Sequence, residues 1–322
     1  MMPAIDHRAG RSTLGAAAPS ALDALAETLG TGVQRGASLA PYTAIRVGGP
    51  ADLLLVVDSL EDLADAVGAA RWYGVSWRVL GGGCNVLVGE GGVRGLVIIN
   101  RAASVSFDDS MVYADSGTKL STVARGAVER SLGGLAWAVG LPGTVGGAVV
   151  GNAGAFGGEV ADTLRFATVL DPQGQVVERE NAWFDFAYRS SRLKEAGGAE
   201  HLVLTAVFDL EPGDAMALRT RADEALAWRR EHQPWGLTMG STFKNPAGHY
   251  AGQLIEEAGL KGYRIGGARV SEQHANFLVN LGDATADDVM GLIEYVRVEV
   301  ERQFGVELAL EIELLGVGET AV

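Results

Sequence analysis

Two glycine-rich segments carry the clearest chemical signal in this chain of 322 residues. The longer one runs from residue 140 to residue 158, where eight of the nineteen residues are glycine. The shorter one is Gly81-Gly82-Gly83-Cys84-Asn85. Glycine lacks a side chain and costs backbone entropy, so it gathers where the backbone must approach a ligand closely. Backbone amides in tight turns bind anions, and two such segments are suited to the two phosphates of a dinucleotide.

Neither segment matches a common phosphate-binding motif. In the shorter one, Val86 stands where the third glycine of a Rossmann fingerprint belongs, and no Walker lysine follows a suitable glycine loop. The longer segment has hydrophobic residues between its glycines, whereas a solvated linker would carry serine and charge. We therefore expect a dinucleotide that is not held in the Rossmann way.

Arg189, Ser241 and Glu311 could carry out chemistry near such a site. An arginine can hold a carboxylate with two parallel hydrogen bonds, although a surface arginine at a strand edge is the simpler interpretation from the residues alone. Ser241 lacks the Gly-x-Ser-x-Gly surroundings of a hydrolytic nucleophile, so it is either a proton donor or a loop hydroxyl that satisfies backbone groups. Glu311 shares a predicted strand face with Glu307 and Glu313, which a solvated face would also explain.

The composition argues against several classes of protein. A net charge of −14 disfavours nucleic acid as a main partner, because phosphate backbones need a basic footprint. Cys84 is the single cysteine, which excludes an intrachain disulfide, and neither His249 nor His274 has a partner at metal-ligand spacing. No apolar run reaches membrane-spanning length, and we see no secretory signal. We expect a cytoplasmic protein with no metal and no membrane insertion.

Hydrophobic periodicity predicts the elements that must position these residues. A strand at 51–57, a helix capped by Ser59 and a strand at 77–80 form a strand–helix–strand unit. The shorter glycine segment follows that second strand, at the edge where α/β folds bind ligands. A helix from about residue 120 is expected to stop at Gly133-Gly134.

The second half of the chain is predicted to contain a strand at 201–210, a charged helix at 215–231 and a helix from about Thr285. A last strand at 307–315 would carry Glu311.

Together, the motifs resemble the UDP-N-acetylenolpyruvoylglucosamine reductases of bacterial peptidoglycan synthesis, from about Tyr42 to Gly316. No single motif is specific, whereas their shared order along the chain is. The motifs are Thr43-x-x-Arg46-x-Gly48-Gly49, Gly81-Gly-Gly-Cys-Asn85, Gly143-Thr-Val-Gly-Gly147 with Asn152-Ala-Gly154, Tyr188-Arg-x-Ser191, Gly240-Ser-x-Phe-Lys-Asn-Pro246, Ala251-Gly-x-Leu-Ile-Glu256, Gly259-Leu-Lys-Gly262 and the final Glu311.

The resemblance implies an α+β fold. It consists of an FAD-binding domain of two α/β subdomains, of the PCMH or vanillyl-alcohol-oxidase type, and a separate α+β substrate-binding domain. The expected parts are an extension at 1–35 that is loosely ordered in part, an FAD-binding domain at 36–213 (subdomains at about 36–100 and 101–213), a substrate-binding domain at 214–304, and a C-terminal strand at 305–318.

The resemblance also implies non-covalent FAD in the glycine segments, NADPH as hydride donor and UDP-N-acetylglucosamine-enolpyruvate as substrate. Arg189 and Glu311 match residues that stabilise an enediolate-like intermediate, and Ser241 matches the proton donor. The implied substrate contacts are Tyr188, Lys244, Asn245 and Glu256. The implied FAD contacts are Arg46, Gly81, Gly82, Gly83, Cys84, Asn85, Gly143, Thr144, Gly146, Gly147, Asn152 and Gly154.

Three positions depart from the family pattern, because Cys84 replaces serine, Gly151 a larger residue and Phe156 a tyrosine. The hydroxyl contact that serine would make to an FAD phosphate is lost at Cys84. Two other functions stay open. The first is an oxidase of the same fold, which often tethers FAD through a histidine, but no histidine lies between His7 and His201. The second is a non-catalytic nucleotide-binding protein, which would have little use for Arg189, Ser241 and Glu311. We expect a monomer.

Overall fold

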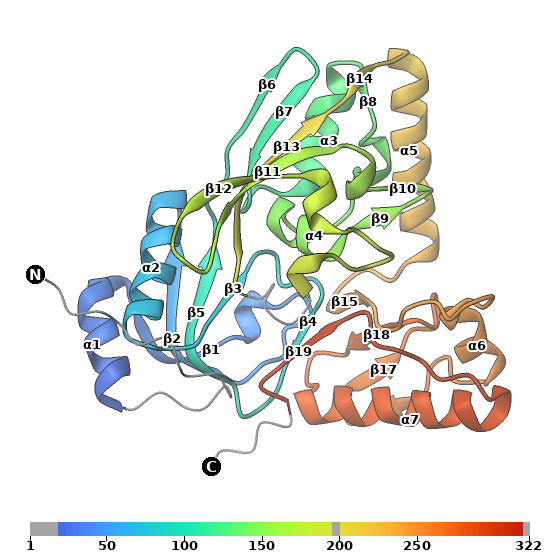
Figure 1. Cartoon of the computed structure of the whole chain (residues 1–322). Coiled ribbons are helices and arrows are strands. Elements are labelled where there is room, and N and C mark those ends of the chain that lie inside the picture. Colours follow the sequence, from blue (N-terminus) through green and yellow to red (C-terminus); the bar gives the residue numbers. More distant parts are fainter. Residues whose placement is uncertain (1–18, 195–199, 318–322) are drawn as a thin grey trace, which may run out of the picture.

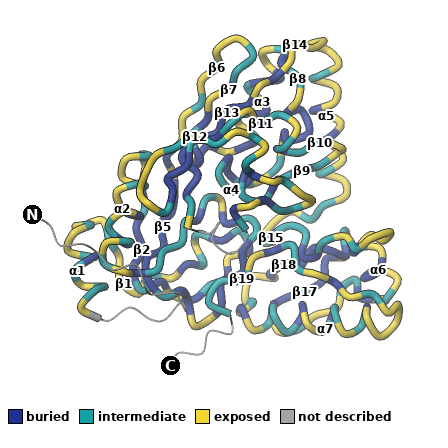
Figure 2. The backbone as a smooth tube through the Cα atoms, viewed as in Figure 1, coloured by how far each residue is buried: buried dark blue, intermediate teal, exposed yellow. Residues whose placement is uncertain are grey.

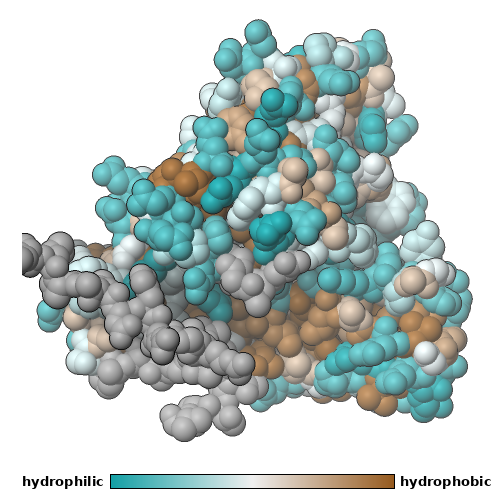
Figure 3. Space-filling view, in the orientation of Figure 1, coloured by the Kyte–Doolittle hydropathy of each residue, from teal (hydrophilic) through white to brown (hydrophobic). Residues whose placement is uncertain are grey.

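The computed structural model describes residues 19–194 and 200–317, and most of its elements gather around three larger sheets (Figure 1). We call the three regions the N-terminal lobe, the central lobe and the C-terminal lobe, in chain order. Buried residues follow the strands of the sheets and the inner sides of the helices (Figure 2). Hydrophilic residues cover most of the upper part of the face seen in Figure 3.

The N-terminal lobe is built on a four-stranded sheet in the order β1-β2-β5-β3. Strands β2, β5 and β3 are parallel, and the α2 helix (Leu60–Trp72) makes the crossover that parallel pairing requires. The Ser59 side chain caps α2 by accepting a hydrogen bond from the Asp62 amide, so the predicted strand–helix–strand unit is present. The strands are β1 (Gln34–Ser38), β2 (Pro50–Val57), β3 (Trp77–Leu80) and β5 (Val93–Asn100).

Helix α1 (Pro19–Leu29) lies within the predicted N-terminal extension. It packs against α2, and Leu25 is fully buried in the core of the lobe. From Pro19 onward the predicted extension is an ordered helix, because α1 has an apolar side that the lobe buries. The prediction of loose order concerned only part of the extension. Residues 1–18 lie outside the described part of the chain.

The central lobe is built on a five-stranded antiparallel sheet in the order β12-β11-β13-β7-β6. Trp137, Phe184 and Phe208 are almost completely buried in its core, and a side chain of this size stabilises the fold by about 1.5–3 kcal/mol. The elements are β6 (Val105–Asp108), β7 (Met111–Asp115), α3 (Leu120–Glu129), α4 (Val145–Gly151), β11 (Leu164–Leu170), β12 (Val176–Glu180) and β13 (Leu202–Asp209).

The predicted end of α3 at Gly133-Gly134 was wrong. The helix ends at Glu129, and Ser131 takes the left-handed conformation (φ 59°) that turns the chain. Gly133 instead belongs to the short strand β8 (Leu132–Gly133), which pairs with β14 (Glu211–Pro212).

Helix α5 (Ala215–His232) runs along the side of the central lobe (Figure 1). It packs against α3 and the short helix at Ala136–Ala138, and its buried Ala222 joins the central core. Because these contacts tie α5 to the central lobe, we propose that the boundary of the last domain lies at the end of α5 and not at residues 213–214. The other predicted domain limits stay predictions.

The C-terminal lobe is a small antiparallel sheet in the order β15-β18-β17-β16, with α6 and α7 packed on it (Figure 1). Thr285 caps α7 in a reciprocal capping box with Asp288. The predicted helix from about Thr285 is present, and its buried side chains recur at helical spacing, at Val289, Leu292, Ile293, Val296 and Val300. The elements are β15 (Thr238–Ser241), α6 (Ala251–Glu257), β16 (Arg264–Ile265), β17 (Ala268–Val270), β18 (Phe277–Asn280) and α7 (Ala286–Phe304).

The end of the described chain returns to the N-terminal lobe. Strand β19 (Glu313–Leu315) pairs in parallel with β4 (Val86–Val88), which follows the shorter glycine segment. The predicted strand at 307–315 is thus shorter than expected, because residues before Glu313 pair with the C-terminal lobe through a bridge from Leu310 to Phe243. Within the described residues, no helix is long and apolar enough to cross a membrane.

Candidate active site

The two glycine segments lie against each other. A Cβ atom added to Gly82 would come within 3.3 Å of the Gly143 Cα atom, and one added to Gly81 would collide with the Thr144 hydroxyl. Gly82 and Gly147 are exposed, so the joined segments present bare backbone to solvent. The sequence predicted two separate anion sites, and the structure instead forms a single surface from both. This surface can accept a pyrophosphate, since side chains would fill the place that a ligand needs.

Some glycines of this surface serve the fold itself. Gly83 has a left-handed backbone (φ 59°), and its Cβ atom would collide with the Tyr42 carbonyl oxygen. Its own carbonyl oxygen accepts a hydrogen bond from the Ala44 amide at 2.9 Å. This contact holds the loop that carries Arg46, an exposed residue whose guanidinium donates to the Pro41 carbonyl.

Gly83→Ala is expected to weaken FAD binding by about tenfold or more. A left-handed conformation costs a non-glycine residue about 1–2 kcal/mol, and 1.4 kcal/mol is about a tenfold change in an equilibrium constant. Titration of the apoprotein with FAD, followed by flavin fluorescence, measures the dissociation constant. Gly91→Ala is the control, because Gly91 has open space around it and no positive φ. Equal FAD affinity of the Gly83 variant and wild type would contradict the assignment of this loop.

Three predicted FAD contacts are occupied by the protein. The Gly146 amide donates to the Ser116 carbonyl at 2.8 Å, which anchors the start of α4. Asn152 is fully buried, and its side chain donates to the Ala187 carbonyl and accepts from the Ala161 amide. Gly154 is buried in the pairing of β9 (Gly154–Ala155) with β10 (Gly158–Glu159). Their roles as FAD contacts stay predictions, and we propose that these three residues position the loops around the glycine surface.

Lys119 is a cation beside the glycine surface that sequence reasoning missed. It forms an isolated bridge with Thr144, and the neighbouring Leu120 amide donates to the Gly143 carbonyl. Burial raises the pKa of the Cys84 thiol, and the charge of Lys119 partly opposes this shift. A thiol held in its neutral form is a poor nucleophile, so Cys84 is better explained as part of the loop than as a reactive group.

Arg189 and Glu311 meet directly, although 121 residues separate them in the sequence. The Arg189 Nε atom lies 2.8 Å from the Glu311 Oε1 atom, and the two side chains are 26% and 16% exposed. Arg189 has a left-handed backbone (φ 55°) in a tight turn that Ala187 and Ser190 close with two mutual hydrogen bonds. Asn152 holds this turn through Ala187, so the arginine projects from a braced loop.

Asn85 of the shorter glycine segment and Thr242, next to Ser241, hold the backbone of Glu311 from two sides. The Asn85 side-chain amide donates to the Glu311 carbonyl at 3.1 Å. The Glu311 amide donates to the carbonyl of Thr242, the residue after Ser241, at 2.9 Å. The ideal Cβ position of Gly240 lies 3.8 Å from the Cys84 carbonyl. The three residues predicted to be catalytic are thus brought together at the edge of the glycine surface.

The predicted substrate contacts differ in whether their side chains already have partners within the protein. Tyr188 is 52% exposed and lies beside the Arg189 guanidinium, 5.5 Å from ring centroid to carbon. Lys244 is tied by its backbone to Ala309, and its ammonium group has no partner among the described residues. Asn245 accepts a hydrogen bond from the Ala251 amide and so helps to start α6.

Glu256 is exposed and forms an ion pair of 2.7 Å with Lys261. Its role as a substrate contact stays a prediction. Across the described residues, no group of three or more His, Cys, Asp or Glu side chains is arranged to hold a metal ion.

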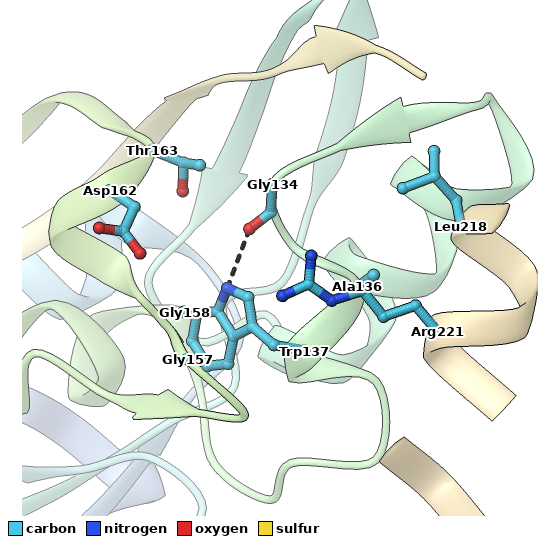
Figure 4. A pocket seen from close by; sticks show the side chains of 9 residues that line it. All are labelled: Gly134, Ala136, Trp137, Gly157, Gly158, Asp162, Thr163, Leu218 and Arg221. Carbon is cyan, nitrogen blue, oxygen red and sulfur yellow. Dashed lines mark hydrogen bonds between the residues drawn. The ribbon is translucent and has the colours of Figure 1, made fainter. Parts of the chain in front are cut away.

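A cavity of about 200 Å³ lies elsewhere, between α5 and the segments around residues 134–137 and 157–163 (Figure 4). Trp137 lines it and donates to the Gly134 carbonyl at 2.9 Å, and Arg221 reaches toward it from α5. None of the predicted catalytic or cofactor-binding residues lines this cavity, so it is not part of the candidate site.

Comparison with known proteins agrees with the fold. Residues 51–179 match the family model of the FAD binding domain. The fold and the site therefore define an FAD-binding flavoprotein. Residues 233–315 match the model described as "UDP-N-acetylenolpyruvoylglucosamine reductase, C-terminal domain", which begins just beyond α5.

Relatives and a solved structure narrow the class further. The chain is 41% identical over 277 residues to the UDP-N-acetylenolpyruvoylglucosamine reductase of Clostridium novyi (85% of this chain, 89% of that one). It is 45% identical over 304 residues to that of Moorella thermoacetica (92% and 99%). The crystal structure of the Thermus caldophilus reductase superposes with a TM-score of 0.75 at 35% identity (88% and 98%). The chain belongs to the UDP-N-acetylenolpyruvoylglucosamine reductase family, and the predicted family, α+β fold and FAD cofactor are confirmed.

Proposed function

We propose that this protein reduces UDP-N-acetylglucosamine-enolpyruvate to UDP-N-acetylmuramate in peptidoglycan precursor synthesis, with FAD as cofactor and NADPH as electron donor. The observation that carries the proposal is the meeting of Arg189, Glu311 and Ser241 at the edge of the glycine surface. Membership of the reductase family supports it. We also propose that it acts as a monomer in the cytoplasm.

The residues of the glycine surface fit FAD. Gly81, Gly82 and Gly83 with Gly143 and Gly147 would hold its pyrophosphate through backbone amides, with Lys119 nearby as a counter-charge. When bound, FAD supplies the hydride that reduces the vinyl carbon of the substrate. The protein's part is to bind and orient the substrate and to manage the charge and the proton.

Arg189 would hold the carboxylate of the enolpyruvyl group. Negative charge spreads into this carboxylate as the vinyl carbon is reduced, and donors that are already in place stabilise such charge best. Glu311 fixes the guanidinium through Nε, which leaves the two terminal nitrogens of Arg189 available for a carboxylate. The braced turn around Arg189 makes this orientation persistent.

Ser241 would donate a proton to the carbon next to the carboxylate. It ends β15, and its strand is paired to Phe277 of β18, so the hydroxyl is carried on a rigid element. A serine hydroxyl is a weak acid in water and needs a tuned position close to the developing carbanion. Its neighbour Thr242 contacts Glu311 through the backbone. This contact fixes the position of Ser241 relative to Arg189 and Glu311, which we call the carboxylate clamp.

Anaerobic stopped flow tests the proposal. The FAD-loaded protein is mixed first with NADPH and then with UDP-N-acetylglucosamine-enolpyruvate, while flavin absorbance is followed. We expect bleaching by NADPH and rapid recovery on addition of the enolpyruvyl sugar. Bleaching without recovery would assign a different electron acceptor, and a protein that binds no FAD would refute the proposal.

A further inference from the structure

Arg229 on α5 is a partly buried cation that the proposed mechanism does not use. Its Nε atom is buried and has no hydrogen-bond partner among the described residues. One terminal nitrogen donates to the Gln233 side chain at 3.2 Å. No carboxylate forms an ion pair with Arg229 within residues 19–194 and 200–317.

A second cation, Arg189, lies close enough to act on its charge. Burial and the positive charge of Arg189 together lower the pKa of Arg229 to about 10. Glu311 is committed to Arg189 and compensates one of these two charges. A cation removed from water without a partner is costly, so the remaining charge of Arg229 calls for an anion from outside the chain.

Two partly exposed aromatic rings surround Arg229, so it lies at an edge that solvent reaches. Its guanidinium lies over the Phe156 ring, 5.2 Å from the centroid, and Phe156 packs edge-on against Trp228. Both rings are about 40% exposed, at 39% and 41%. Phenylalanine offers the arginine a ring face and places no hydroxyl there, so it supports the guanidinium without neutralising its charge.

We propose that Arg229 is a substrate-binding residue that holds an anionic oxygen group of the nucleotide-sugar substrate beside Arg189. The inference rests on the proposed function and extends it, since that function assigns only Arg189 and Glu311 to the substrate's charge. The substrate carries two anionic groups, the carboxylate and the diphosphate, and both present oxygen acceptors of the kind that a guanidinium binds.

Binding to the oxidised, FAD-loaded protein without NADPH tests the inference. The probes are UDP-N-acetylglucosamine, which has the diphosphate but no carboxylate, and UDP-N-acetylglucosamine-enolpyruvate, which has both. Arg229→Gln is expected to weaken binding of the enolpyruvyl ligand at least about tenfold, since a charge-assisted hydrogen bond is stronger than its neutral counterpart. Arg230→Gln is the control, because Arg230 is the exposed neighbour on the same helix. If the affinity for both ligands falls, Arg229 binds the diphosphate. If only the affinity for the enolpyruvyl ligand falls, Arg229 binds the carboxylate.

Thermal unfolding separates this role from a structural one. For Arg229→Gln, the melting temperature without ligand is expected to stay the same or rise, because an uncompensated charge is removed, while the increase produced by ligand becomes smaller. Arg229→Lys is expected to recover part of the binding. Unchanged affinity for both ligands in Arg229→Gln would overturn the inference, whether or not its melting temperature falls. A wild-type protein that does not turn over the substrate would instead refute the proposed function.

Discussion

Ser241→Ala is expected to lower kcat by about two to four orders of magnitude, the usual contribution of a positioned general acid. The expected loss lies entirely in the second half of the reaction. Ser241 stands near Glu311 at the edge of the glycine surface, and in the proposed mechanism it acts on the substrate and has no part in flavin reduction. FAD affinity should not change, because within the described part of the chain no atom of Ser241 is among the nearest neighbours of the glycines in the two segments.

Rapid kinetics separate the two half-reactions. NADPH should bleach the flavin of the Ser241 variant at the wild-type rate, and recovery with the enolpyruvyl sugar should slow by the same factor as kcat. Ser121→Ala, on the helix α3 of the central lobe, is the control for a lost hydroxyl. Recovery at the wild-type rate in the Ser241 variant would show that the proton comes from another group.

Arg189→Lys is expected to lower kcat/KM by about a hundredfold to a thousandfold, the cost of removing one preorganised donor at a developing negative charge. Lysine keeps the charge but lacks the planar fork, so a single ammonium cannot bind Glu311 and grip a carboxylate in the arginine's geometry. Steady-state kinetics with varied enolpyruvyl sugar measure the effect.

Arg192→Lys provides the matched control for this substitution. Arg192 lies three positions further along the same segment, is exposed, and binds the Trp183 carbonyl away from Glu311. It should keep nearly wild-type kinetics. If Arg189→Lys also stayed within about threefold of wild type, the assignment of the carboxylate clamp to Arg189 would be refuted, since the expected loss is at least about a hundredfold.

Local patterns were predictable from the sequence because they depend on neighbouring residues. The strand–helix–strand unit with its Ser59 cap and the Thr285 start of α7 follow from periodicity and capping preferences. The packing of α5 was not predictable in this way. Its buried residues are only Ala222 and Ala225, so the helix has no apolar stripe that would indicate which lobe it covers.

The site was predictable as a set of residues but not as an arrangement. Motif order identified Arg189, Ser241 and Glu311, whereas their meeting depends on strand pairing between distant parts of the chain. Motifs also do not separate residues that face a ligand from residues that support the loop, and Asn152, a predicted FAD contact, is fully buried. Arg229 lies outside the quoted motifs, and only its burial and unpaired state single it out.

The pairing of β19 with β4 also constrains when the protein can become active during its synthesis. Strand β4 is made early, yet its partner includes Leu315, near the end of the described chain. A nascent chain that has not yet released this segment from the ribosome lacks both the partner of β4 and Glu311. Contacts between such distant parts of a chain form late, because the loop between them must close first. The chain therefore completes its carboxylate clamp only after residues 311–315 have left the ribosome, when the glycine surface has already had time to form.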